Sequence, residues 1–148
     1  MAKRSIYFVI VLLTFTSCQD EADCISVTTD FANLQFYKIQ DNELDTVDFI
    51  SLKPLLSDSI LLADTTINGT IQLPINPNTE STAYAFETEF GLDTLILGYN
   101  TSTRLIAEDC GIEVIIFELK ELRNDFDSIR IVNDVLIEDI NEDIRIYN

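Results

Sequence analysis

The residues that could carry chemistry in this chain are of few kinds. The 148 residues include 26 aspartates and glutamates and three cysteines, but no histidine. Histidine-based acid–base catalysis and the Ser-His-Asp or Cys-His arrangements are therefore excluded. Only four glycines are present, and none belongs to a phosphate-binding G-K-[ST] motif. Two carboxylates suffice for glycoside hydrolysis, but among 26 of them some pair will lie at any chosen distance. The sequence therefore predicts that the protein is not an enzyme.

Calcium binding is the more specific use of the carboxylates. The stretch "DNELDTVD" brings four of them together within eight residues, and "NDFD" and "EDINED" offer further oxygen ligands. Calcium takes six to eight oxygens, but the glycine of the EF-hand loop is missing from each cluster. Acidic turns that are simply solvated are the alternative, so we expect no cofactor, with calcium as the exception to test. The calcium candidates are Asp41, Glu43, Asp45 and Asp48.

Cys18 follows a segment typical of secretion. Lys3 and Arg4 precede the apolar residues 5–15, and small polar residues lead to the cysteine. The apolar run has the length of a signal peptide and is too short to span a bilayer permanently. The junction resembles the lipobox of bacterial lipoproteins, in which the cysteine receives a diacylglycerol. The resemblance implies a signal peptide at 1–17 and a membrane anchor through lipid on Cys18. An ordinary secretory signal that happens to end near Cys18 is the alternative.

The residues directly after Cys18 are acidic. This stretch resembles the export tags that follow the lipidated cysteine in Bacteroidetes lipoproteins and direct them to the outer leaflet of the outer membrane. The resemblance implies an outer-membrane, cell-surface location. A plain solvated linker, with an anchor that faces the periplasm, is the alternative. The residues of the tag are Gln19, Asp20, Glu21 and Asp23.

The two remaining cysteines, Cys24 and Cys110, form an even pair in what would be an oxidising compartment. Such a pair suggests a disulfide, which would pin the acidic stretch at 18–24 to the folded domain. Two free thiols are the alternative. A metal site is a poor third, because two cysteines without histidine and without C-x-x-C spacing make an incomplete zinc set.

The rest of the chain, 25–148, has the pattern of one all-β domain. In "AYAFETEF" at 83–90, every second residue is aromatic or threonine, so one face is predicted to be buried. Residues 93–99 alternate likewise, and 112–122 are apolar on both faces, as expected of a central strand. Residues 132–140 have helical spacing as well, but their isoleucine content favours strands. We predict an antiparallel β-sandwich of about seven to nine short strands after the N-terminal signal segment.

The order of several pieces carries a family resemblance. Residues 81–111, "STAYAFETEFGLDTLILGYNTSTRLIAEDCG", are combined with Cys24, with "IQLPIN" and with the closing "DSIRIVND…DIRIYN". Together they resemble a family of short uncharacterised outer-membrane lipoproteins from Bacteroidetes, over most of residues 18–148. The resemblance implies a membrane-anchored β-rich domain and supplies no activity. Residues 40–68 match no part of that pattern.

Charge limits the possible partners. The formal net charge is -17, and a polyanion repels phosphate backbones and flat anionic membrane surfaces. Nucleic acid is therefore excluded as a partner. We expect a non-catalytic, lipid-anchored protein of the cell envelope that serves as a structural or partner-binding accessory subunit. An outer-membrane protein would be a natural partner. A calcium- or glycan-binding surface module is the alternative.

Overall fold

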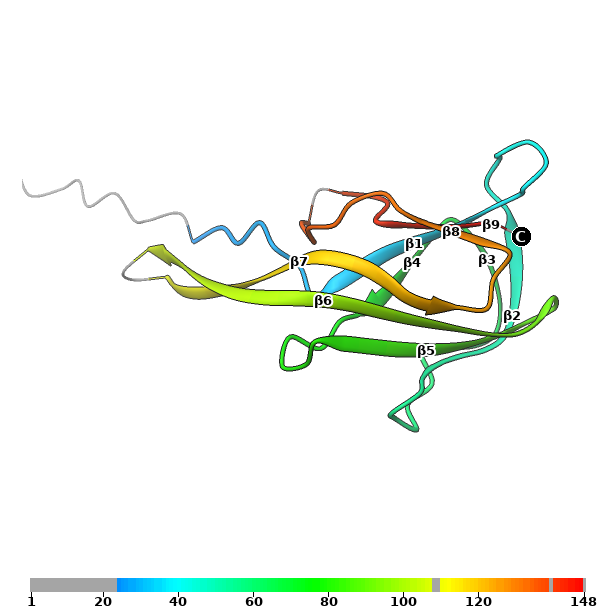
Figure 1. The fold of residues 1–148 in the computed structure, drawn as a ribbon, viewed down its shortest axis with the longest axis horizontal. Helices are drawn as coiled ribbons and strands as arrows, with labels where there is room; N and C mark the ends of the chain where they lie inside the picture. Colours follow the sequence, from blue (N-terminus) through cyan, green and yellow to red (C-terminus); the bar gives the residue numbers. More distant parts are fainter. Residues whose placement is uncertain (1–23, 108–109, 139, 148) are drawn as a thin grey trace, which may run out of the picture.

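The chain forms a β-sandwich in a computed structural model that describes residues 24–107, 110–138 and 140–147 (Figure 1). Within these ranges every regular element is a strand. The strands are β1 Phe31–Tyr37, β2 Thr46–Pro54, β3 Leu62–Asn68, β4 Thr70–Pro74, β5 Ser81–Thr88, β6 Gly91–Ala107, β7 Gly111–Asn124, β8 Ser128–Ile131 and β9 Ile144–Tyr147.

Two sheets make up the sandwich. One has the strand order β4-β1-β9-β8 and the other β3-β2-β5-β6-β7. The prediction of an all-β sandwich is confirmed. One pairing differs from a purely antiparallel fold, because β1 and β9 run parallel, with Leu34 opposite Ile144. Parallel neighbours need a crossover between them, and here the other strands lie between β1 and β9 in the chain.

The core lies between the two sheets and is built by alternation along each strand. Leu34 and Phe36 of β1 face Phe49 of β2 and Phe86 of β5, and all four are almost fully buried. The ring centroids of Phe36 and Phe86 lie 6.3 Å apart with their planes at 70°. Such edge-to-face pairs add to the free energy gained by burial alone.

The strands β6 and β7 are longer than predicted, with 17 and 14 residues. They pair as one antiparallel hairpin from Leu95 opposite Asn124 to Ala107 opposite Gly111, with register shifts at three places. Such bulges increase the local twist of a hairpin. The hairpin runs along the long axis of the molecule and extends beyond the other strands at one end (Figure 1).

The prediction that 112–122 is a central strand is wrong, because β7 lies at the edge of its sheet. Its free side is met by the segment at 134–136. The backbone N–H of Leu119 donates to the carbonyl oxygen of Asp134, and the N–H of Leu136 donates to that of Ile116. Leu136 is fully buried in the core. This cover explains why the run of apolar residues resembles that of a central strand.

The segment at 132–138 and 140 is neither a helix nor a regular strand, although its spacing allowed both. It makes one isolated bridge, from Ile137 to Thr28. The unassigned stretch 40–68 contains β2, β3 and the loop between them. Thr46 lies opposite Asn68 at one end of this antiparallel pair.

Candidate functional site

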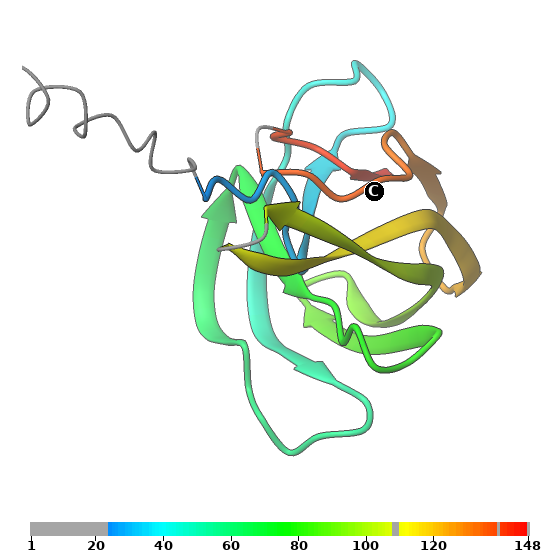
Figure 2. The ribbon, with the colours of Figure 1, turned by 90° about the vertical axis from the view of Figure 1, so that its left-hand side faces the viewer.

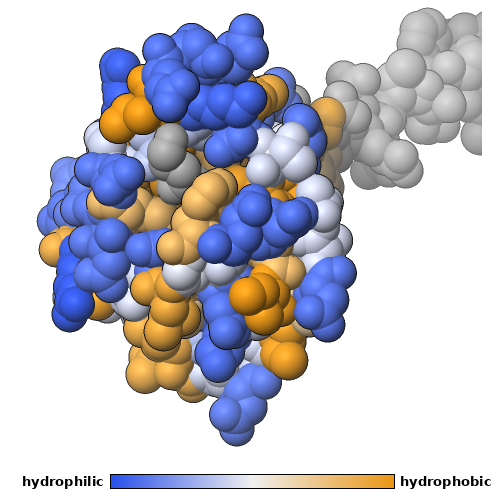
Figure 3. Space-filling view, turned by 90° about the vertical axis from the view of Figure 1, so that its right-hand side faces the viewer, coloured by the Kyte–Doolittle hydropathy of each residue, from blue (hydrophilic) through white to orange (hydrophobic). Residues whose placement is uncertain are grey.

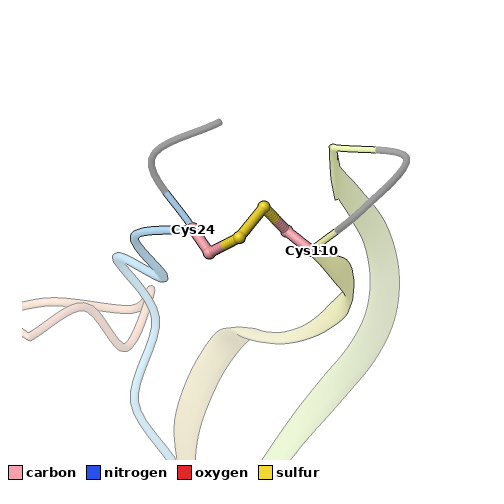
Figure 4. Close-up of a disulfide and its surroundings, with 2 residues drawn as sticks. All are labelled: Cys24 and Cys110. Atoms are coloured by element: carbon pink, nitrogen blue, oxygen red, sulfur yellow. A yellow bond between two sulfur atoms is a disulfide. The ribbon is translucent and has the colours of Figure 1, made fainter. Parts of the chain in front are cut away.

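A disulfide joins Cys24 to Cys110 at the end of the molecule where the hairpin protrudes (Figure 4). The two Cα atoms lie 5.2 Å apart and the cysteines are 86 positions apart in the chain. The predicted pairing is therefore present. It fixes the start of the segment at 24–30, here called the linker, against the β6–β7 hairpin.

An ion pair between buried Glu113 and exposed Arg104 continues this attachment. The Glu113 side chain in β7 is only 3% exposed. One of its carboxylate oxygens accepts hydrogen bonds from the Ser26 hydroxyl at 2.9 Å and the Thr28 hydroxyl at 3.3 Å. The other accepts a bond from Nε of Arg104 in β6 at 2.7 Å. The Ser26 hydrogen bond first, and then Arg104, hold the pKa of Glu113 below its usual range.

Beside this pair, a groove of about 640 Å³ opens between the linker, the hairpin and the edge of the four-stranded sheet. Because Glu113 accepts hydrogen bonds on both oxygens, it is poorly suited to move a proton. Asp30 and Glu138 are exposed and make the wall acidic, and the remainder is a mixture of neutral polar and apolar side chains. The groove's other lining residues include Ser26, Thr28, Phe31, Gln72, Pro77, Ile106, Ile112, Val114 and Ile116.

The predicted calcium candidates engage in local hydrogen bonds instead of facing one point. Asp41 accepts a hydrogen bond from the N–H of Glu43 at 3.1 Å, and Asp45 accepts one from the N–H of Thr46 at 2.9 Å. Asp48 accepts from the Thr66 hydroxyl on the neighbouring strand. In the part of the chain that the structure describes, no three His, Cys, Asp or Glu residues gather as a metal site would require. Calcium binding itself stays an untested prediction.

Other predicted site residues lie outside the described part of the chain. They are Cys18, the proposed lipid site, and the residues of the acidic tag, Gln19, Asp20, Glu21 and Asp23.

Asp143 is a buried carboxylate that the sequence did not single out. It lies just before β9 and is completely inaccessible to solvent. Its Oδ2 accepts the backbone N–H of Asn33 at 2.7 Å, while Oδ1 has no hydrogen-bond partner among the described residues. Burial raises the pKa of Asp143 to about 6. The sequence offers no signal for this, because "EDINED" has the composition of a solvated loop.

A second unpredicted cluster lies on the four-stranded sheet. The Arg145 guanidinium lies 4.2 Å from the centre of the Tyr37 ring. It also donates to both carboxylate oxygens of Glu142, at 3.0 and 2.7 Å. These contacts already satisfy the charge of Arg145, so the cluster is best explained as structural.

Comparison with known proteins identifies the chain at the level of a family. A family model described as a family of unknown function (DUF6452) matches residues 46–148. The chain belongs to this family. The DUF6452 match takes in Cys110 and the whole hairpin, whereas the linker and β1 precede it. Searches of curated proteins and of solved structures gave no significant match.

Among the described residues of this DUF6452 protein, no helix has both the length and the apolar character needed to cross a membrane.

Proposed function

We propose that this DUF6452 protein is a non-catalytic accessory protein of the bacterial cell envelope, anchored in the outer membrane by lipid on Cys18 and exposed at the cell surface. The signal-like residues 1–17 and the acidic tag support the address. The observation that carries the proposal is the position of the Cys24–Cys110 disulfide. It attaches the end of a short tether to one end of an elongated sandwich.

The tether limits where the membrane can be. Cys18 precedes Cys24 by six residues, and six residues span about 20 Å at most. A lipid on Cys18 would therefore hold the disulfide end within that distance of the bilayer. The groove opens at the same end, so its partner would be a protein in or on the membrane. The acidic rim at Asp30 and Glu138 and the apolar side chains of the groove would suit a segment with basic and apolar side chains.

The anchor is tested by Cys18→Ala. We expect the wild-type protein to sediment with the outer membrane and the variant to be released in soluble form, because a durable anchor needs the acyl chains. The measurement is fractionation followed by immunoblotting. The double variant Cys24→Ser/Cys110→Ser is the matched control and should still sediment, since it keeps the thiol that would carry lipid. If the Cys18→Ala protein stays with the membrane, the proposed anchor is wrong.

The groove is tested by Glu138→Lys. This residue is exposed at the rim, and reversing its charge should repel a basic partner while leaving the fold intact. Chemical cross-linking in intact envelopes should give a defined adduct for wild type and at least a tenfold weaker one for the variant, a loss of about 1.4 kcal/mol in binding. Glu118→Lys, exposed on β7 outside the groove, serves as the control. Equal adducts from all three proteins would exclude the groove as the binding site.

A further inference from the structure

The protruding part of the hairpin has one apolar face whose side chains stay exposed, and two of them, Ile112 and Val114, also line the groove. Leu105 lies directly opposite Ile112, and Thr103 lies opposite Val114. Directly opposed residues share a face, and successive residues alternate between faces. Arg104 and Glu113 therefore occupy the other face, toward the linker. On the apolar side, here called the hairpin face, Leu105 is 57% exposed, Ile112 68% and Val114 38%.

The linker adds apolar side chains at the same end. Ser26 and Thr28 bind Glu113, whereas Ile25 and Val27, which alternate with them, are exposed. The disulfide holds both elements together (Figure 4). In the view from this end, the linker crosses beside the hairpin (Figure 2). Apolar side chains are thus exposed on two joined elements at one end of the molecule.

We propose that the hairpin face rests on the lipid bilayer next to the anchor, so that the domain has a fixed orientation on the membrane. The proposal rests on the proposed lipid on Cys18. The tether of six residues ends at Cys24, so the membrane surface would lie within about 20 Å of the hairpin face. Exposed apolar side chains gain free energy when they enter the boundary between headgroups and acyl chains.

Charge limits the depth of this contact and the choice of lipid. The chain has a net charge of -17, and Glu108 and Asp109 directly precede Cys110 in the sequence. Carboxylates are costly in the hydrocarbon layer. The hairpin face would therefore lie along the interface instead of inserting tip first. It would favour zwitterionic headgroups over anionic ones, because the latter repel an acidic domain.

The same strand provides a matched control site at the far end. Leu92 lies near the start of β6 and is 70% exposed. It is separated from Leu105 by 13 positions, or roughly 40 Å at about 3.3 Å per residue. The end opposite the hairpin tip has hydrophobic side chains scattered among hydrophilic ones (Figure 3). A domain that rests on its hairpin face would keep Leu92 in water.

Tryptophan fluorescence can test this directly, because the natural chain contains no tryptophan. Leu105→Trp and Leu92→Trp are each purified in the lipidated, full-length form and reconstituted into phosphatidylcholine vesicles with and without brominated acyl chains. Both sites are exposed strand positions, where tryptophan is well tolerated. A side chain about 5–10 Å deep in the interface should lose about half of its emission to bromine. We expect that loss for Leu105→Trp, and less than a tenth of the emission lost for Leu92→Trp.

Three outcomes would contradict the proposal in distinguishable ways. If neither protein sediments with the vesicles, the lipid anchor fails and the orientation fails with it. If both sediment and are quenched equally little, the anchor stands and the bilayer contact is wrong. If the Leu105→Trp emission shifts to the blue without bromine quenching, then protein, for example a second copy, covers the hairpin face instead of lipid.

Discussion

The Asp143→Asn variant should gain stability relative to wild type as the pH rises. The difference in free energy of unfolding, variant minus wild type, should be larger at pH 8 than at pH 3. Between pH 3 and pH 8 this difference should grow by about 3 kcal/mol. The pKa of Asp143 rises from 3.8 to about 6 on folding, and each pKa unit corresponds to about 1.36 kcal/mol. For a domain of this size, that is roughly 10 °C in melting temperature.

The sign follows from which state binds the proton more tightly. Burial favours the neutral carboxyl, so the folded protein holds the proton of Asp143 up to about pH 6, whereas the unfolded chain releases it near pH 3.8. This contribution to stability is fully present below pH 3.8 and is lost as the pH rises through 6. Asn is neutral at every pH. Its side-chain oxygen can still accept the N–H of Asn33, and its amide group would take the place of the unpartnered Oδ1.

Urea unfolding of both proteins across this pH range measures the effect. All other carboxylates are common to both proteins, so the difference between the two curves isolates Asp143. Asp58→Asn, at an exposed loop position, controls for the general effect of removing one negative charge. Parallel stability curves for wild type and Asp143→Asn would show that the Asp143 carboxyl titrates normally in the folded state.

The extent to which the sequence predicts this fold depends on whether a residue's role is visible locally. The strands at 83–90 and 93–99 are predictable because their alternation directly reports one buried face. The sequence predicts a turn at 98–100 followed by a strand, but β6 continues without a break through this stretch, and its residues 100–105 are all exposed. They are strand because β7 pairs with them. The parallel pairing of β1 with β9 joins residues 110 positions apart, from Leu34 to Ile144, and no local pattern encodes it.

In the candidate site, too, some features follow from the local sequence and others only from contacts between distant residues. An even number of cysteines outside the lipid site was enough to suggest the disulfide. Two of the three partners of Glu113, in contrast, are hydroxyl residues 85 and 87 positions away, and serine and threonine in a linker carry no such signal. Burial of Asp143 depends on the loop at 140–142 folding over Asn33, whose side-chain amide donates to the Ile140 carbonyl oxygen. That contact too exists only in three dimensions.

Loss of the disulfide is expected to be the largest single destabilisation. In the chain-entropy description, a cross-link across 86 positions contributes about 4 kcal/mol by restricting the unfolded chain. Cys24→Ser/Cys110→Ser should therefore unfold in urea with a free energy lower by about that amount. The measurement is best made in a Cys18→Ala background, which prevents mispairing. The parent in that background, measured with reductant, should match the serine variant, because both lack the cross-link.

The linker has other contacts that could hold it without the disulfide. The N–H of Glu138 donates to the Val27 carbonyl oxygen and that of Ile75 to the Asp30 carbonyl oxygen, in addition to the bonds between Ser26, Thr28 and Glu113. If these contacts alone hold the linker in place, the free energy of unfolding of the serine variant will fall by less than about 1 kcal/mol, and the cross-link adds little to folding. With the full loss, hydrogen exchange at the backbone N–H of Glu138, which donates to Val27, should quicken more than exchange in the core. The lipid tether would then end in a mobile segment that no longer holds the hairpin near the bilayer. Bromine quenching at Leu105→Trp should therefore fall toward the value at Leu92→Trp.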